Sequence, residues 1–209
     1  MKIVSLKPEY INGLLKLEEK MYWRGDKWKN LWQKEAKEKF REFIEDYLIN
    51  FPKGCFGLIE GKEILGAMFF TKISKFKTIP YLHRVSEYLE VNGRIAYVSL
   101  FVIKDAKNKD EIGRKLYEYA EEVAVRLACK TIEVVIYSSP LEEQIIKENN
   151  YRRLKDKFDW EIYSGMKVPS RIFYYNLKNY FDDQDIEIYT QKRIKEFEKE
   201  DRNLPREQD

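Results

Sequence analysis

Residues 97–116 read YVSLFVIKDAKNKDEIGRKL, and this stretch decides the fold. The apolar run that ends at Ile103 predicts a buried strand, and the polar residues after it predict a short loop followed by a helix. The first turn of a helix presents unpaired N–H groups and the positive end of the helix dipole, so it can bind a pyrophosphate. Gly113 would let the backbone approach such a ligand closely. Many strand–loop–helix units bind nothing, so this pattern alone leaves both interpretations open.

Hydrophobic patterns on both sides of this unit predict the remaining elements. Upstream they predict a strand at residues 2–6, a helix from Pro8, a turn-rich aromatic stretch at 22–30, a helix at 31–49, a hairpin of Cys55–Glu60 and Glu63–Ile73, and a strand at 94–103. Downstream they predict a helix at 110–127, a strand at 131–137, a helix at 140–149, and strands at 151–163 and 171–177. This order predicts an α/β (α+β) fold in which helices cover both faces of a mixed sheet.

The charge of the chain is unevenly distributed. The 209 residues carry a net charge of +3 from 39 basic and 36 acidic residues, a balance that argues against a nucleic-acid partner. We divide the chain into a domain at residues 1–181 and a charged tail at 182–209, which carries ten acidic and six basic residues. The tail pattern predicts a helix at about 186–200, either a solvated surface helix or an element that binds a partner or a second copy of the chain. The mildly basic domain suits an anionic ligand such as a phosphorylated cofactor, or no ligand in particular.

Single residues argue against several classes of site. Cys55 and Cys129 lie far apart in apolar segments, which is typical of small core residues and not of a disulfide or a metal pair. His83 is the only histidine and has no ligand cluster beside it in the sequence, so we expect no metal site. No signal region opens the chain and no apolar run approaches ~20 residues, so we expect a cytoplasmic protein with no membrane span. Abundant Lys, Glu, Ile and Tyr with few Gln is typical of a thermophile protein.

The central segment resembles the donor-binding motif of the GNAT superfamily of acyl-CoA N-acyltransferases. In that family a strand of the type Tyr-Ile-x-x-Leu-x-Val leads to Arg-Gly-x-Gly-Ile-Gly-x-x-Leu at the start of a helix. The residues that match are Tyr97, Val98, Phe101 and Ile103 in the strand and Ile112, Gly113 and Leu116 in the helix. The loop departs from the family pattern at Asn108, Lys109 and Glu111. The resemblance extends in order and spacing over residues 1–177 and implies a mostly antiparallel central sheet.

A second unit downstream resembles the next part of the family pattern, which is a strand, an Asn, a helix containing a Tyr, and a Gly-aromatic ending. The Asn position falls on Ser139, and the Gly-aromatic ending falls on Asn150 and Tyr151. Asn tolerates the left-handed conformation that Gly would take there. The helix Tyr position falls on Ile146, which cannot donate a proton.

The resemblance implies transfer of an acyl group, most simply acetyl, from acetyl-CoA to a primary amine of a small-molecule or protein acceptor. It implies that backbone N–H groups of Phe101, Val102 and Ile103 bind the thioester carbonyl. It also implies that the cofactor's pyrophosphate is bound by N–H groups at the start of the helix, from Asn108, Lys109, Asp110, Glu111, Ile112, Gly113 and Arg114. Ser139 of the downstream unit is implied to bind the cofactor as well. Glu111 would repel the pyrophosphate unless it turns outward or pairs with Arg114 or Lys115.

Candidates for the proton-transfer groups are Tyr137 as acid and Glu133 as base. A tyrosine at a strand end is also typical of packing, and Glu133 can equally be a solvated carboxylate on the strand face. The acceptor would lie against residues 22–30 and 74–93, whose aromatic side chains either line a cleft or form a local core: Trp23, Trp28, Trp32, Tyr81 and His83. The alternative function is a catalytically inactive GNAT-fold protein that retains CoA or acts as a scaffold. A homodimer is compatible with either function.

Overall fold

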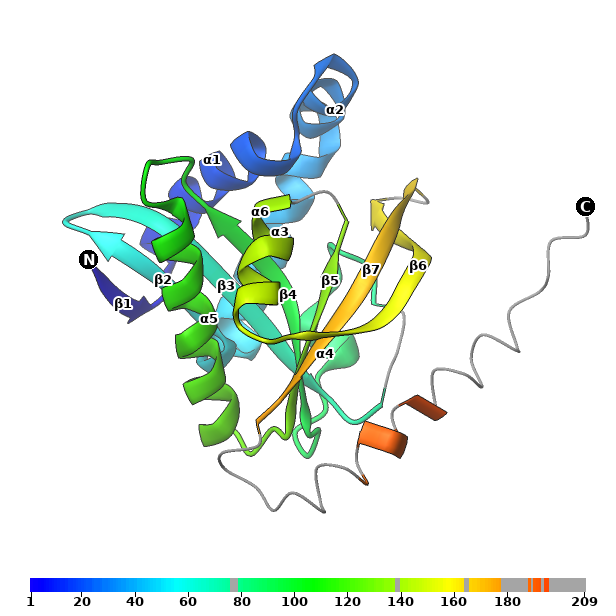
Figure 1. Cartoon of the computed structure of the whole chain (residues 1–209). Helices are drawn as coiled ribbons and strands as arrows, with labels where there is room; N and C mark the ends of the chain where they lie inside the picture. Colours follow the sequence, from blue (N-terminus) through cyan, green and yellow to red (C-terminus); the bar gives the residue numbers. More distant parts are fainter. Residues whose placement is uncertain are drawn as a thin grey trace, which may run out of the picture.

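The structure is a computed structural model of the chain. It describes residues 1–75, 79–137, 140–163 and 166–177, together with residues 188, 190–192 and 194–195 of the tail (Figure 1). Most of the predicted tail helix, and the expected boundary between domain and tail, lie outside the described residues.

Within the described residues, seven strands form one sheet in the order β1-β2-β3-β4-β5-β7-β6. The strands are β1 (Lys2–Ser5), β2 (Cys55–Glu60), β3 (Glu63–Ile73), β4 (Ile95–Ile103), β5 (Thr131–Ile136), β6 (Arg152–Tyr163) and β7 (Met166–Asn176). Every neighbouring pair is antiparallel except β4 and β5, which run parallel. The predicted fold class, a mixed and mostly antiparallel sheet, is confirmed.

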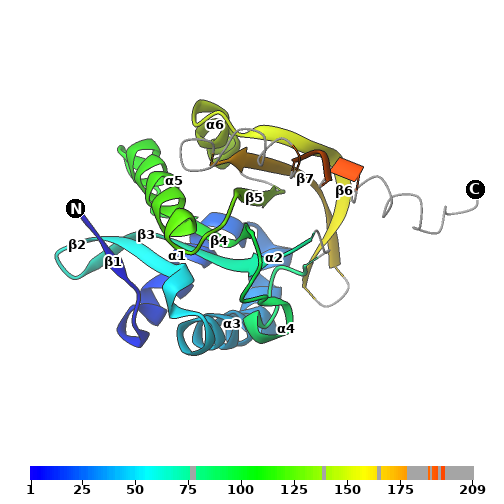
Figure 2. The same cartoon turned by 90° about the horizontal axis from the view of Figure 1, so that it is seen from below.

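Helices cover both faces of the sheet (Figure 2). The helices are α1 (Ile11–Tyr22), α2 (Asp26–Leu31), α3 (Lys37–Asn50), α4 (Val85–Tyr88), α5 (Lys109–Arg126) and α6 (Pro140–Glu148). Short 3-10 segments, Pro8–Tyr10 and Pro52–Gly54, precede α1 and follow α3, and a π-helical segment, Trp32–Ala36, joins α2 to α3. Helices α1, α3 and α4 pack on one face and α5 and α6 on the other. No helix in the described part of the chain combines the length and apolar character that crossing a bilayer requires.

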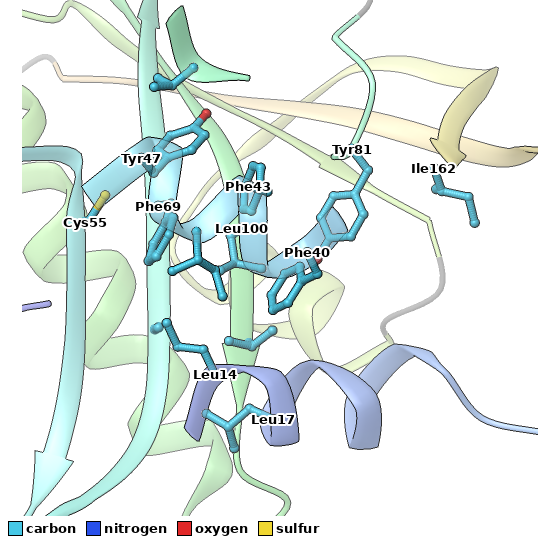
Figure 3. Packing of buried hydrophobic residues seen from close by; sticks show 14 of the residues in the cluster. Leu14, Leu17, Phe40, Phe43, Tyr47, Cys55, Phe69, Tyr81, Leu100 and Ile162 are labelled. Carbon is cyan, nitrogen blue, oxygen red and sulfur yellow. The ribbon is translucent and has the colours of Figure 1, made fainter. Parts of the chain in front are cut away.

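Two apolar cores follow from this layering. On the α1–α3 face, Leu14, Phe43, Tyr47, Phe69 and Leu100 pack together (Figure 3). On the other face, α5 buries a stripe with helical spacing against the strands, formed by Ile112, Leu116, Ala120 and Val123. Side chains of β5 alternate between the two cores, because successive residues of a strand point to opposite faces.

Three features differ from the prediction. The aromatic stretch at 22–30 contains helix α2, which follows a break at Gly25 with φ 84°. The π-helical segment after it keeps the chain helical as far as α3. Strand β7 begins at Met166 and not at residue 171. Pro169 lies beyond the last β5–β7 pair, Ile136 with Arg171, where β7 has a neighbour on one side only, and such a position tolerates proline.

The central strands β4 and β5 separate along their length (Figure 1). They pair only from Ile95 with Thr131 to Val98 with Val134, although β4 continues to Ile103 and β5 to Ile136. The pairing of β3 with β4 also shifts at this point, because Phe69 pairs with Leu100 while Phe70 pairs with Val98. Ser99 is therefore the extra residue of a β-bulge. We call the space between Ser99–Ile103 and Val135–Ile136 the β4–β5 gap.

Candidate active site

A small cavity lies at the β4–β5 gap. It is lined by Tyr22, Tyr81, Val98, Ser99, Leu100, Phe101, Val134, Val135, Tyr137, Glu142 and Trp160. Its volume is about 20 Å³. Roughly 10–15 Å³ is enough for one water molecule, so the cavity has room for a single small group.

The backbone of β4 faces this gap at Phe101. The Tyr22 hydroxyl, at the end of α1, donates a hydrogen bond of 2.8 Å to the carbonyl oxygen of Phe101. The N–H and C=O of one strand residue point to the same edge of the strand, so the Phe101 N–H faces the gap as well. The N–H of Lys104 instead donates to Leu65 of β3, at 2.7 Å. The end of β4 therefore has an N–H and a C=O that face the gap, and Tyr22 already bonds the C=O.

Glu142 of α6 reaches the same place. Its side chain is 4% exposed, and burial raises its pKa from the usual 4.5 to about 8. The Tyr117 hydroxyl donates to Glu142 Oε1 at 2.9 Å, and the Tyr22 hydroxyl oxygen lies 3.5 Å from Oε2. Because the single Tyr22 proton is used by Phe101, a protonated Glu142 can donate to Tyr22. A carboxylic acid at neutral pH and a free backbone edge thus meet at one cavity.

A second buried carboxyl, Glu18 of α1, lies beside the aromatic lining. It is 0% exposed, and burial raises its pKa from 4.5 to about 8 against the opposing effects of Tyr81 and Trp23. Trp23 Nε1 donates to Oε1 at 3.0 Å. Glu18 Oε2 and the Tyr81 hydroxyl lie near each other without meeting hydrogen-bond geometry, and neither atom has a partner among the described residues. Two buried acids therefore flank the gap, one on each face of the sheet.

The bulge residue Ser99 belongs to a buried hydrogen-bond chain. The Tyr47 hydroxyl donates to Ser99 Oγ at 2.6 Å and lies 2.7 Å from Nε2 of His83. His83 Nδ1 lies 2.7 Å from the carbonyl oxygen of Pro80. Burial lowers the pKa of His83 from 6.5 to about 4, so the ring is neutral near pH 7. These hydrogen bonds connect α3 to the bulge and hold the backbone in place at the point where β4 separates from β5.

Cationic side chains in the first turns of α5 lie next to carboxylates, which offset their positive charge. Lys115 Nζ lies 2.7 Å from Glu111, Lys109 Nζ lies 3.2 Å from Asp105, and Arg114 lies 3.8 Å from Glu148. The hydrogen bond and charge of Lys115 lower the pKa of Glu111. A Cβ added to Gly113 would overlap Cδ1 of Ile145 in α6, so any larger residue here must displace the Ile145 side chain.

A larger groove lies along α1 at the end of β4. Its volume is about 630 Å³, and its lining includes five cations, Lys16, Lys20, Arg24, Lys62 and Lys104, and three carboxylates, Glu9, Glu63 and Asp105. Lys104 is already paired with Glu63 at 2.6 Å. Within the described residues, no carboxylate forms an ion pair with Lys16, Lys20 or Lys62. The groove therefore has three lysines without an ion pair in the described residues, whereas Lys109, Arg114 and Lys115 of α5 each face a carboxylate.

Comparisons with known proteins identify the fold. The sequence matches no family model and no curated protein. Among solved structures it is similar to the loading GNATL domain of CurA from Lyngbya majuscula, with 13% identity over 85% of this chain and 98% of that one and a TM-score of 0.65. The GNAT-like decarboxylase GphF, solved with isobutyryl-CoA, gives 13% identity over 85% and 100% and a TM-score of 0.62. An aminoglycoside 6'-acetyltransferase type Ii gives 14% identity over 85% and 97% and a TM-score of 0.56.

This chain has the GNAT fold. The splayed pair β4–β5 lies in the middle of the sheet of that fold, between α1 and α3 on one face and α5 and α6 on the other. The solved structures include acetyltransferases and a decarboxylase, so the GNAT fold by itself does not decide the reaction. The side chains at the gap must decide it.

The structure separates the predicted residues of this GNAT fold into three groups. Tyr137 and Phe101 line the cavity. Ile103 lies at the end of the gap and lines the larger groove along α1, which we call the basic groove. Val102 pairs with Ala67 of β3, and Glu133 is buried on β5 opposite Tyr97; neither lines the cavity.

The third group is the start of α5. Asn108, Lys109, Asp110, Glu111 and Arg114 surround its first turns, and Ile112 and Gly113 are buried beneath them. Ser139 lies outside the described residues. Of the acceptor-side aromatics, Trp23 and Trp32 are buried in the α1–α3 core with ring centroids 5.2 Å apart, and Tyr81 lines the cavity.

The sequence patterns did not reveal Glu18, Ser99, Glu142 or Trp160, and they placed Tyr22 only within the acceptor-side stretch 22–30. The signal for the two acids was a carboxylate on an apolar helix stripe. Glu18 follows Leu14 by four residues, and Glu142 precedes Ile145 and Ile146 by three and four. A carboxylate in such a stripe is expected to be buried. Burial of a carboxylate costs free energy unless the group is paired or protonated, so it points to a special environment.

Proposed function

We propose that the protein is an acyl-CoA-dependent N-acyltransferase that transfers acetyl from acetyl-CoA to a primary amine, with Glu142 as the proton-transfer group. One observation carries this proposal: a protonated carboxyl and the free backbone edge of β4 meet at the β4–β5 gap of a GNAT fold. The acceptor is a small molecule or a protein side chain.

The backbone at the gap is compatible with the thioester end of the donor. The Tyr22 hydroxyl already donates a hydrogen bond to the Phe101 carbonyl oxygen. It takes the position that a hydrogen-bond donor of a bound ligand would have. Binding therefore requires Tyr22 to release Phe101, because the cavity of about 20 Å³ is far below the roughly 300 Å³ of a typical ligand pocket. The Phe101 N–H then faces the thioester oxygen, where negative charge develops during the reaction.

Glu142 supplies and recovers a proton in this scheme. The neutral amine forms a C–N bond at the acyl carbon while the C–S bond breaks, and the electron pair left on sulfur takes the proton of Glu142. The proton lost by the nitrogen restores Glu142, so amide and free thiol are the only products. A pKa of about 8 is close to the working pH, where an acid–base group is most effective, typically by about 10²–10⁴-fold.

The anionic end of the donor has two possible binding places. The start of α5 offers N–H groups, but its cations are paired with carboxylates. The groove along α1 begins at Ile103 and carries Lys16, Lys20 and Lys62. Because phosphate oxygens gain more from cations that no carboxylate compensates, we propose that the phosphates lie in this basic groove.

The direct test is calorimetric titration with acetyl-CoA, free CoA and, as a control, ATP, followed by detection of free thiol with a panel of primary amines. We expect acetyl-CoA to bind at micromolar concentration and ATP much more weakly. Glu142→Gln should bind acetyl-CoA within about threefold of wild type and lose about 10²–10⁴-fold in kcat. Unchanged kcat in a folded Glu142→Gln protein would remove Glu142 from the mechanism.

Tyr22→Phe tests whether the closed gap limits donor binding. The variant keeps the ring but removes a hydrogen bond worth about 0.5–1.5 kcal/mol that must be broken, so we expect about 2–10-fold tighter acetyl-CoA binding. Affinity that falls would mean that the Tyr22 hydroxyl contacts the donor.

A non-catalytic GNAT-fold protein is the second candidate. The closed cavity and the compensated start of α5 favour it. No binding of acetyl-CoA up to millimolar concentration by wild type or Tyr22→Phe would select this function, and the search would then turn to protein partners.

A further inference from the structure

Four aromatic rings surround the cavity at the gap, and we call them the aromatic box. Its members are Tyr22, Tyr81, Trp160 and Tyr137, and each ring contacts the next in a closed circuit. Ring centroids are 6.4 Å apart for Tyr22–Tyr81, 5.4 Å for Tyr81–Trp160, 5.6 Å for Trp160–Tyr137 and 5.2 Å for Tyr137–Tyr22. Three of these contacts are tilted by 54–65°, so the four rings do not form a single stack, and all four line the cavity.

Two buried carboxyl groups border this box. Glu142 lines the cavity itself, and Glu18 lies beside the Tyr81 hydroxyl with its Oε2 unpartnered among the described residues. Burial, followed by the charge of Glu18, raises the pKa of Tyr81 and of Tyr137 well above 10. Burial and then Glu142 do the same for Tyr22. Each of the two carboxyl groups therefore lies close to at least one ring of the box.

Rings with carboxyl groups at their edge suit a cation, because a bound ammonium lowers the pKa of a neighbouring carboxyl group and favours its charged form. The face of an aromatic ring attracts an ammonium group within about 6 Å of its centroid, and most strongly where water is excluded. Tyr81 and Trp160 are each 4% exposed, so two of the four rings are shielded from solvent. The unpartnered atoms Glu18 Oε2 and Tyr81 Oη are acceptors that an ammonium N–H can satisfy directly or through water.

We propose that the aromatic box binds the acceptor as a charged, unbranched primary alkylammonium. This inference rests on the proposed acyl transfer for its biological meaning, but binding by the box does not require the donor. A volume of about 20 Å³ admits one group of the size of water, which a terminal –NH₃⁺ matches and a quaternary ammonium exceeds. Tyr22 and Tyr137 are partly exposed, so the alkyl chain leaves the box between them.

The box also lies where an acceptor must be. Ser99, Leu100 and Phe101 of β4 form part of the same cavity wall. An amine in the box is therefore beside the backbone edge that faces the thioester in the proposed function.

The experiment measures binding of n-butylammonium without any donor, by calorimetry, with n-butanol and tetramethylammonium as probes of charge and size. We expect n-butylammonium to bind at least tenfold more tightly than either. Trp160→Leu and Glu142→Gln should each weaken its binding by about tenfold or more, and Trp160→Phe, which keeps a ring, by less than about threefold. Glu121→Gln is the matched control, because Glu121 is another partly buried acid, of pKa about 7, on α5 outside the cavity.

Two results would overturn the proposal: equal binding of n-butanol and n-butylammonium, or unchanged affinity in folded Trp160→Leu and Glu142→Gln proteins. The outcomes also separate the two proposals. Ammonium binding without any acyl transfer supports the box and removes the proposed function. Transfer to other amines by a protein that does not bind n-butylammonium supports the function and removes the box.

Discussion

At the residue scale, Glu142 makes stability depend on pH. Its pKa is about 8 in the folded protein and the usual 4.5 when the chain is unfolded. The folded state therefore holds the proton more tightly, and the resulting stabilisation is complete below pH 4.5 and lost as pH rises through about 8. Glu18 contributes in the same direction.

We expect Glu142→Gln to lose less stability than wild type between pH 5 and pH 8. Glutamine cannot ionise, so the part of the pH dependence due to Glu142 disappears while that of Glu18 and Glu121 remains. Urea unfolding at four pH values, followed by circular dichroism, measures the difference. Parallel stability curves for the two proteins would show that Glu142 is not buried as an acid.

Gly113 gives a second residue-scale prediction. Alanine normally stabilises a helix interior by about 0.5–1 kcal/mol relative to glycine, but here its Cβ overlaps Cδ1 of Ile145. Gly113→Ala should therefore destabilise the protein by about 1–3 kcal/mol.

The matched partner is Ile145→Val, which removes the overlapping methyl group. We expect the double variant to be clearly more stable than the sum of the two single changes, since valine leaves room for the new Cβ. Denaturant unfolding of all four proteins measures this coupling. Strict additivity would contradict the packing explanation and restore a ligand as the reason for the glycine.

At the element scale, α1 and α5 offer alternative places for the phosphates of the proposed donor. Lys16→Ala with Lys20→Ala removes two groove cations that have no ion pair in the described structure, whereas Lys109→Ala removes one already bound to Asp105. We expect the α1 pair of changes to weaken acetyl-CoA binding about tenfold or more and Lys109→Ala to weaken it by less than about threefold.

Pantetheine, which has no phosphate, provides the control because its binding should respond to neither change. Calorimetry with both ligands makes the comparison. A larger loss from Lys109→Ala would place the phosphates at the start of α5, as the family resemblance implies.

At the scale of the whole molecule, the buried part of the described chain ends just after β7. Leu177 is the last buried residue of the described chain, and its N–H donates to Lys130 at 3.0 Å. The described contact with the tail is a side-chain hydrogen bond of 2.8 Å from Asn176 to Thr190. We expect a chain truncated after residue 181 to melt within about 5 °C of the full chain. A much larger loss would make the tail part of the domain.

The same truncation tests the role of the charged tail in assembly. We propose that any homodimer forms through the tail, since both apolar cores are complete within the described domain. Light scattering should then give a monomer for the truncated chain. A dimer that survives truncation would locate the interface on the domain.

Composition yields one further prediction for the whole molecule. Abundant Lys and Glu, typical of thermophile proteins, predicts a melting temperature above the roughly 45–65 °C of mesophile domains. Calorimetric melting within that range would contradict it.

The sequence by itself determined the order of elements and hence the fold. The hairpin of β2 and β3 has the predicted bounds, and α5 and β5 begin or end within a residue or two of theirs, because each is set by local periodicity and turn chemistry. The sequence also indicated which strand and helix border the candidate site, because the apolar run to Ile103 and the following Gly113 mark β4 and α5.

Only the tertiary structure decided which side chains form the site. Tyr22, Tyr81, Glu142 and Trp160 come from four segments distant in the chain, and no periodicity relates them. The point at which β4 leaves β5, the bulge at Ser99 and the burial that protonates Glu142 each depend on several packed elements at once. Fold is set by local patterns that any window of sequence contains, whereas chemistry at a site depends on distances and burial that exist only after the chain has packed.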